Sequence, residues 1–460
     1  MISKSWNRAE TRSLPREISW DRAAVSVALD EFIARGTIAV LIFTALAHGA
    51  VEPWSVALFE VMVTGLLLLW GIKALADRHL EISVPLATIP ILAFLALGLV
   101  QSIAFAGGTG SRLSLSMDVE ATRHAVTTLI FLTGSFLLAA NFLITKERLL
   151  LLSNVLTGFG TLLAVFALIQ YFTWDHRMYW LRATPYDVFG PFVNRNHFAG
   201  YMAMLAPIPI GLMLTVVRGQ ARLIYGFAAV IMGIAAIVSG SRSGVFSLFG
   251  ALVFMALLGR RSRAQNQSTR LSRIAPVAIV AVAIVGGVLW IGATPVIERF
   301  GRAVDALVHS EGPDLSRPEI WRDTIHVIRT YPILGTGLGS YATVYPAHAQ
   351  TAEHFGLNYA HNDYLQVLAD NGIAGGFIVI GFAAIILIGI YRGLRSRDPL
   401  SSGMSLAAGA GIIAVAIQSL SDTDLQIPSN ALLFLVLTAV VSRIGSRKIE
   451  LMKNDLENEQ

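Results

Sequence analysis

The chain has 460 residues, of which 54% are hydrophobic and only 14% are charged. Soluble domains carry about 25% charged residues, so this composition excludes an ordinary water-soluble globular protein. The sequence contains no cysteine, which excludes disulfides and thiolate metal sites. The formal net charge of +5 is no sign of nucleic-acid binding, because basic residues in membrane proteins mainly set topology. We therefore expect an all-α, polytopic membrane protein.

About twelve apolar stretches have close to the ~20 residues that a helix needs to cross ~30 Å of hydrocarbon. Residues 1–32 are polar and are expected to form a cytoplasmic tail rather than a cleavable signal peptide. Residues 33–292 are predicted to hold nine transmembrane helices, at 33–50, 54–77, 83–106, 124–144, 149–172, 197–217, 223–240, 244–259 and 274–292. Residues 293–370 are expected to form one large polar loop that contains short helices. Three more spans within 371–445, at 372–391, 402–420 and 431–445, precede a cytoplasmic tail at 446–460.

Basic residues divide unevenly between the two sets of loops. With both termini in the cytoplasm, most of the 35 Lys and Arg residues fall on the cytoplasmic side, as the positive-inside rule requires. The large loop then lies outside, which is the periplasm in a Gram-negative cell. Every histidine except His79 lies at or beyond the outer end of a span. Glu60 is the clearest ionisable residue within a span, and such sparse charge favours an enzyme at the outer face over an ion-coupled transporter.

Two outer stretches concentrate polar side chains beside apolar spans. "FGPFVNRNHFAGY" (189–201) places Asn194, Arg195, Asn196 and His197 in a row. Helix capping by asparagine is the alternative interpretation there. "SGSRSG" (239–244) is a short turn whose single charge is Arg242. That arginine can snorkel to lipid headgroups, or bind a phosphate through its planar fork.

A third stretch, "SRPEIWRDTIHVIRTYPILGTGLGSY" (316–341), predicts a helix in the large loop. Ser316 and Glu319 have capping-box spacing, with Pro318 just inside the start and Pro332 ending the helix. The basic residues of this helix are Arg317, Arg322, His326 and Arg329, and the last three share one face. A solvated basic face is the alternative to a binding role. Ile320, Ile325, Ile328 and Trp321 are expected to pack on the other side, and the glycine-rich "GTGLGS" has neither the P-loop nor the full dinucleotide pattern.

The fourth stretch, "AHNDYLQVLADNGIAGG" (360–376), predicts a helix that begins near His361 and breaks at Asn371-Gly372, before the next span. The positive end of a helix disfavours imidazolium, and a free histidine has a pKa of about 6.5. His361 is therefore a candidate base near pH 7, although an outer-loop histidine can also be purely structural.

Taken together, these stretches resemble the O-antigen ligase and polymerase family of bacterial envelope glycosyltransferases. The resemblance rests on "FVNRNHFAGY", "GSRSG", "SRPEIW" followed by "YPILGTGLGSY", and "AHNDYLQVLADNGIAGG", in that order over roughly residues 150–420. "HGAVEPWS" (48–55) also resembles a stretch common in exopolysaccharide-associated members.

The resemblance implies a helical, GT-C-like fold in the bacterial inner membrane, with the active site facing the periplasm. It implies a glycan on undecaprenyl pyrophosphate as donor, without a metal or nucleotide cofactor. The acceptor is the lipid A core for a ligase, or another lipid-linked repeat of O-antigen or exopolysaccharide for a polymerase. The matching residues are Arg242 and Arg317, which engage the pyrophosphate in the family, and His361, which serves the acceptor. The remaining candidates for substrate binding are Asn194, Arg195, Asn196, His197, Arg322 and Asp363.

Physical chemistry agrees with this assignment. Fixed cations lower the barrier where a leaving pyrophosphate gains charge, and His361 is the expected base for the acceptor hydroxyl. No acidic pair has a convincing metal-binding pattern, although Asp314, Glu319, Asp323 and Asp363 lie in the loop. Two other functions are left open: a transporter of lipid-linked glycans that docks them on outer arginines, and a non-catalytic scaffold of an export complex. The motifs do not separate ligase from polymerase.

Overall fold

A computed structural model describes residues 22–106, 112–173, 177–184, 188–259, 271–292, 317–349 and 357–458. Predictions that fall on the rest of the chain lie outside the described residues. These are the tail up to residue 21, the loop at 293–316 with His309, Asp314 and the Ser316 cap, and the loop segment at 350–356.

Helices dominate the described chain. They are α1 (Arg22–Leu46), α2 (Pro53–Asp77), α3 (Thr88–Gln101), α4 (Val119–Phe142), α5 (Lys146–Phe172), α6 (Arg195–Leu205), α7 (Pro207–Thr215), α8 (Ala221–Val238), α9 (Arg242–Leu258), α10 (Leu271–Gly292), α12 (Arg317–Thr330), α13 (Tyr341–Val344), α14 (Asp363–Leu394), α15 (Pro399–Gln418) and α16 (Pro428–Asn458). Short 3-10 turns lie at η1 (Tyr345–Ala347) and η3 (Asp424–Gln426).

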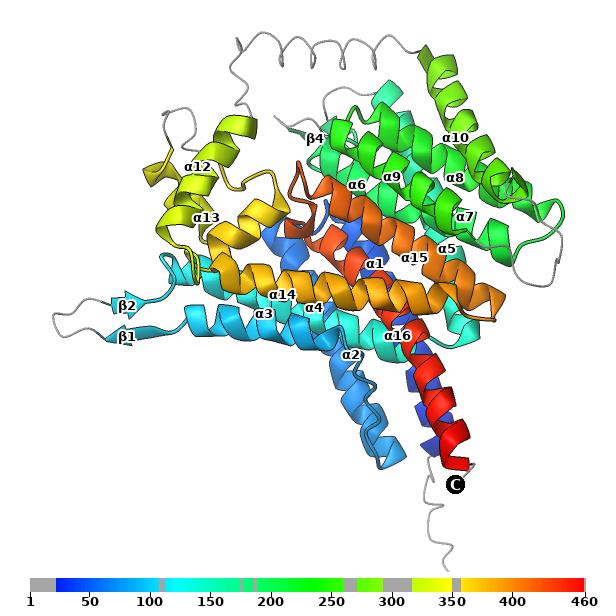
Figure 1. The fold of residues 1–460 in the computed structure, drawn as a ribbon, viewed down its shortest axis with the longest axis horizontal. Helices are drawn as coiled ribbons and strands as arrows, with labels where there is room; N and C mark the ends of the chain where they lie inside the picture. Colours follow the sequence, from blue (N-terminus) through cyan, green and yellow to red (C-terminus); the bar gives the residue numbers. More distant parts are fainter. Residues whose placement is uncertain are drawn as a thin grey trace, which may run out of the picture.

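Two small antiparallel hairpins qualify the all-α prediction. Strand β1 (Ala104–Ala106) pairs with β2 (Arg112–Ser114), and β3 (Arg177–Met178) pairs with β4 (Arg182–Ala183). The first hairpin projects beyond α3 at the left of Figure 1. The predicted span at 83–106 is therefore wrong in its length, because its helix covers only 14 residues before the chain turns extended.

Eight stretches of helix among the described residues are long and apolar enough to cross a membrane, and three shorter apolar helices accompany them. The chain is thus a multi-pass membrane protein. The eight do not include α1, which begins at Arg22 and carries charged residues in its first half. The predicted span at 197–217 consists of two helices, α6 and α7, which meet at Ala206 just before Pro207. The helix at the C-terminus continues through the predicted tail as far as Asn458.

Helix α15 lies at the centre of the bundle, where it packs against α6, α7, α9, α14 and α16. Its sequence "SSGMSLAAGAG" is rich in small residues, which let helix backbones approach closely in a membrane. A Cβ on Gly411 of α15 would lie 2.9 Å from the backbone oxygen of Met204 in α6, so these two helices are in near-backbone contact. This packing fixes the C-terminal end of α15, where the candidate site begins.

Helix α14 is broken at Gly372, as the sequence predicts. Gly372 has φ 59° and ψ −160°, a conformation essentially restricted to glycine. The glycine-rich loop after α12 docks on this break: the amide of Thr336 donates to the carbonyl of Ala369 at 2.9 Å, and that of Ile373 donates to Pro332 at 2.8 Å. The loop therefore joins α12 to the membrane helix α14.

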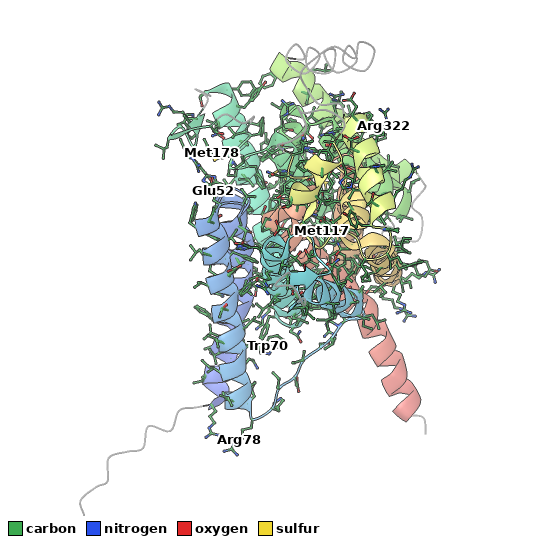
Figure 2. The ribbon with its side chains drawn as sticks, turned by 90° about the vertical axis from the view of Figure 1, so that its left-hand side faces the viewer. Glu52, Trp70, Arg78, Met117, Met178 and Arg322 are labelled. Atoms are coloured by element: carbon green, nitrogen blue, oxygen red, sulfur yellow. The ribbon has the colours of Figure 1, made fainter. Side chains whose placement is uncertain are left out.

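Three of the loops predicted to share one side of the membrane have labelled residues toward one end of the molecule. Figure 2 places Glu52, Met178 and Arg322 toward one end, and Trp70 and Arg78 toward the other. Near the second end, Arg148 pairs with Asp30 of α1, which ties α5 to the start of α1. Helices α12 and α13 lie over the first turns of α14 (Figure 1).

Candidate active site

The start of α14 presents His361 in a strained conformation. Asn362 caps the helix, since its side chain accepts a hydrogen bond from the amide of Leu365 at 3.0 Å. His361 precedes this cap with φ +49°, in the left-handed region that non-glycine residues rarely adopt. Such a conformation costs about 1–3 kcal/mol and is found preferentially at functional sites.

The segment between α15 and α16 supplies a buried carboxylate that faces both His361 and Arg317. The Nη2 of Arg317 donates to Oδ2 of Asp422 at 3.3 Å. The Nδ1 of His361 lies 3.6 Å from Oδ1 of Asp422, which is an ion-pair separation and too long for a hydrogen bond. The indole of Trp321 donates to the carbonyl of Ala360 at 3.1 Å, which holds α12 against the residue before His361.

The anion of this group, Asp422, is buried, and the two basic residues, Arg317 and His361, are partly exposed. The side chain of Asp422 is fully buried, whereas those of Arg317 and His361 are 35% and 30% exposed. Burial by itself raises the pKa of Asp422, but the nearby His361, His197 and Arg317 outweigh it and hold that pKa below the ordinary value. Asp422 is therefore an ionised counter-anion beneath two groups that reach the surface.

A second histidine–carboxylate pair lies next to the first. The Nδ1 of His197, in the first turns of α6, is 2.9 Å from Oδ1 of Asp424, two residues after Asp422. Asp424 is fully buried, and burial raises its pKa above the ordinary value. The amide of Asn430 donates to the backbone carbonyl of His197 at 3.0 Å. His197 was predicted to bind substrate; the structure places it beneath the surface, against Asp424.

The start of α14 supports the same segment from the other side. Asp363 accepts hydrogen bonds from the hydroxyl of Ser419 at 2.7 Å and the amide of Leu425 at 3.3 Å. Asn362 donates to the carbonyl of Leu420 at 2.9 Å. Asp363, another predicted substrate-binding residue, is thus buried and bonded to the chain segment that carries Asp422.

Arg242 lies at the beginning of α9, after the cap Ser241, whose hydroxyl accepts from the amide of Gly244 at 3.1 Å. One turn further, Ser247 donates to the side chain of Gln418 at 2.9 Å, four residues before Asp422. Arg242 therefore sits at the same end of the bundle as Asp422. Its side chain is exposed, and no hydrogen bond or ion pair joins it to another described residue.

The "NRNH" stretch is divided between capping and packing. Asn194 caps α6, since its side chain accepts from the amide of Asn196 at 2.8 Å, so the capping alternative is confirmed for this residue. The carbonyl of Asn196 accepts from Gln418 at 2.9 Å. Arg195 is half-buried and has interaction partners of its own.

Arg322 lies on the exposed face of α12 together with His326 and Arg329, as the spacing predicts. Within the described chain, no hydrogen bond or ion pair connects it to Arg317, His361 or Asp422. The expected packing of Ile325 is wrong, because this side chain is 40% exposed. The buried positions of α12 are Ile320, Asp323, Thr324 and Val327, and the two polar side chains bond to tyrosines 345 and 341.

Sequence analysis missed Asp422 and Asp424. The available signal was "SDTDLQ" (421–426), two acidic residues in a short link between two apolar spans. Among the described residues, no group of three or more His, Asp or Glu side chains is arranged to hold a metal ion. Chemically, the residues around Asp422 offer a base, His361, beside a buried counter-anion. They also offer guanidinium groups that are directed outward.

Comparison with known families identifies part of the chain. Residues 227–380 match the family model described as O-antigen ligase. The match includes Arg242, Arg317 and His361 and ends before Asp422. The match supports the family resemblance of the motifs, and it indicates a membrane glycosyltransferase-type domain over residues 227–380. No curated protein matches the chain.

Proposed function

We propose that this protein transfers a glycan from undecaprenyl pyrophosphate to an acceptor hydroxyl, at the periplasmic face of a bacterial inner membrane. The family match supports the class of reaction. The observation that carries the proposal is the convergence of Arg317, at the start of α12, and His361, just before the cap of α14, on the single buried carboxylate of Asp422.

The base in this reaction is the Nε2 of His361. Its Nδ1 is buried and faces Asp422, so Nε2 is the nitrogen left to take a proton. The acceptor hydroxyl oxygen attacks the anomeric carbon while its proton passes to Nε2. The bond from that carbon to the pyrophosphate oxygen breaks, and its electron pair leaves with the undecaprenyl pyrophosphate. Asp422 stabilises the imidazolium that forms.

The guanidinium groups act on the leaving pyrophosphate. Negative charge on the bridging oxygen grows as the glycosidic bond breaks, and a fixed cation at that point lowers the barrier. Arg317 is held in place by Asp422, while Arg242 is exposed at the neighbouring helix end and can close on the second phosphate. Planar guanidinium groups suit this task because they bind two phosphate oxygens at once.

The direct test is transfer by the purified protein in detergent, with an undecaprenyl-pyrophosphate-linked repeat as donor. Lipid A core and a second lipid-linked repeat serve as alternative acceptors, with EDTA added to parallel reactions. Transfer to lipid A core identifies a ligase, and transfer to the second repeat identifies a polymerase. A transporter or a scaffold forms neither product, since no gradient or export partner is present in detergent. Absence of both products, with folded protein and intact donor, refutes the proposal.

A further inference from the structure

The segment that carries Asp422 is held from two sides. On one side, Asn362 and Asp363 bond to Leu420, Ser419 and Leu425. The contact on the other side is the His197–Asp424 pair, at 2.9 Å. Residue 422 therefore sits between two anchors only a few residues apart, and its carboxylate position depends on both.

Helix α6 is shaped to receive Asp424. Gly200 lies one turn after His197, and a Cβ at this position would be 1.6 Å from Oδ2 of Asp424. That oxygen is fully buried and makes no hydrogen bond to another described residue. The absence of a side chain at residue 200 thus creates the space in which Asp424 reaches His197.

We propose that His197 is a positioning residue for the transfer reaction: through Asp424 it fixes the 419–425 segment so that Asp422 faces His361 and Arg317 together. This inference rests on the proposed function. His197 does not touch the substrate in this role, which departs from its predicted part in substrate binding. Its imidazole is buried, and its Nδ1 already bonds to Asp424.

The charged groups around Asp422 define what its displacement does. Arg317 comes from α12, His361 and Asp363 from the start of α14, His197 from α6, and Asp424 from the same segment. If Asp422 withdraws, Arg317 loses the carboxylate to which it donates, and His361 loses the carboxylate that faces its Nδ1. The cation and the base are then no longer held against one group, so kcat falls.

The test compares three substitutions of His197 in the full-length protein in detergent. The amide nitrogen of asparagine occupies nearly the position of Nδ1, whereas that of glutamine reaches the position of Nε2. H197N therefore keeps the bond to Asp424, and H197Q and H197A lose it. We expect H197A and H197Q to lower kcat on the order of 10²-fold, the loss that follows a misplacement of about 1 Å. We expect H197N to retain most of the kcat of the unmodified protein.

Gly200→Ala provides an independent route to the same displacement. It removes no titratable group, but its methyl group occupies the place of the Asp424 carboxylate. We expect the same loss of kcat as for H197A. Gly158→Ala in α5 is the matched control, since a Cβ there meets nothing within 4 Å, and it retains the activity of the unmodified protein.

The outcomes separate this inference from the proposed function. Failure of the unmodified protein to transfer glycan rejects the proposed function itself. An active unmodified protein with equally active H197A and G200A variants rejects the positioning role alone. Equal loss of kcat in H197N and H197Q also rejects it, because a general loss of packing at this place produces that pattern.

Discussion

Replacing Asp422 by asparagine removes the negative charge beneath His361 and Arg317 while keeping the size of the side chain. At an effective dielectric constant of about 20, two charges 3.3 Å apart attract by about 5 kcal/mol. Desolvation of the carboxylate opposes this attraction. Deleting one partner of a fully buried pair costs ~3–5 kcal/mol, and deleting one at the surface costs ~0–1 kcal/mol.

The Asp422 pairs fall between these limits, because the carboxylate is buried and both cations are about one-third exposed. We expect D422N to lower the free energy of unfolding by about 2 kcal/mol at neutral pH. The effect on catalysis is larger in relative terms. With Arg317 and His361 no longer held by one carboxylate, kcat for glycan transfer falls roughly 10²–10³-fold, as for loss of one electrostatic group.

Two measurements check this prediction on the same preparations: thermal unfolding in detergent and the rate of glycan transfer. D398N is the matched control. Asp398 accepts hydrogen bonds from the amide and the hydroxyl of Ser401, and it caps the opposite end of α15. Asparagine caps helices about as well as aspartate does, so this control keeps most of its stability and keeps the transfer rate. A D422N variant with the rate of the unmodified protein refutes the assignment of Asp422.

Four further outcomes follow from the same geometry. Because the pKa of Asp422 is lowered in the folded protein, this carboxylate stabilises the fold at pH values above the ordinary Asp pKa of about 3.9. This stabilisation is lost as the pH falls through the folded-state pKa. The difference in unfolding free energy between the unmodified protein and D422N therefore narrows in acid unfolding below about pH 4. H361G is more stable than H361A by about 1 kcal/mol in thermal unfolding, because alanine is strained at positive φ, while neither variant transfers glycan. R242A loses transfer activity on the order of 10²-fold and R242K does not restore it, since lysine lacks the two-pronged geometry; equal rates for R242K and the unmodified protein contradict this. G372A unfolds at least ~2 kcal/mol more easily, because its Cβ would lie 2.4 Å from the carbonyl of Ile333; unchanged unfolding contradicts the role of the break.

The parts of the fold that sequence analysis predicted are those set by local chemistry. Apolar length identified most of the membrane helices, and Asn371-Gly372 identified the break in α14. The beginning of α1 was missed because its polar residues are compatible with a tail. They are helical here, and Asp30 pairs with Arg148, a residue 118 positions further along the chain. A sequence pattern over one turn of helix does not indicate a contact with so distant a residue.

The same reason explains what was missed in the site. His361 and Arg317 could be singled out by their residue types beside apolar spans. Their meeting at Asp422 depends on contacts between distant residues, 105 positions apart for Arg317 and Asp422, and the His197–Asp424 contact joins residues 227 positions apart. The strain at His361 was equally hidden, because a histidine in the sequence gives no indication of a positive φ.

The carboxylate behind Arg317 has a consequence for turnover. Arg317 never has to give up its internal partner, so a phosphate oxygen that approaches it meets a cation that is already partly neutralised. In the proposed transfer, the affinity of Arg317 for the lipid carrier is correspondingly moderate, both before and after the glycan has left. In many enzymes, product release limits the turnover rate. A guanidinium shared with an aspartate favours prompt departure of the spent carrier, which frees the surface for the next one.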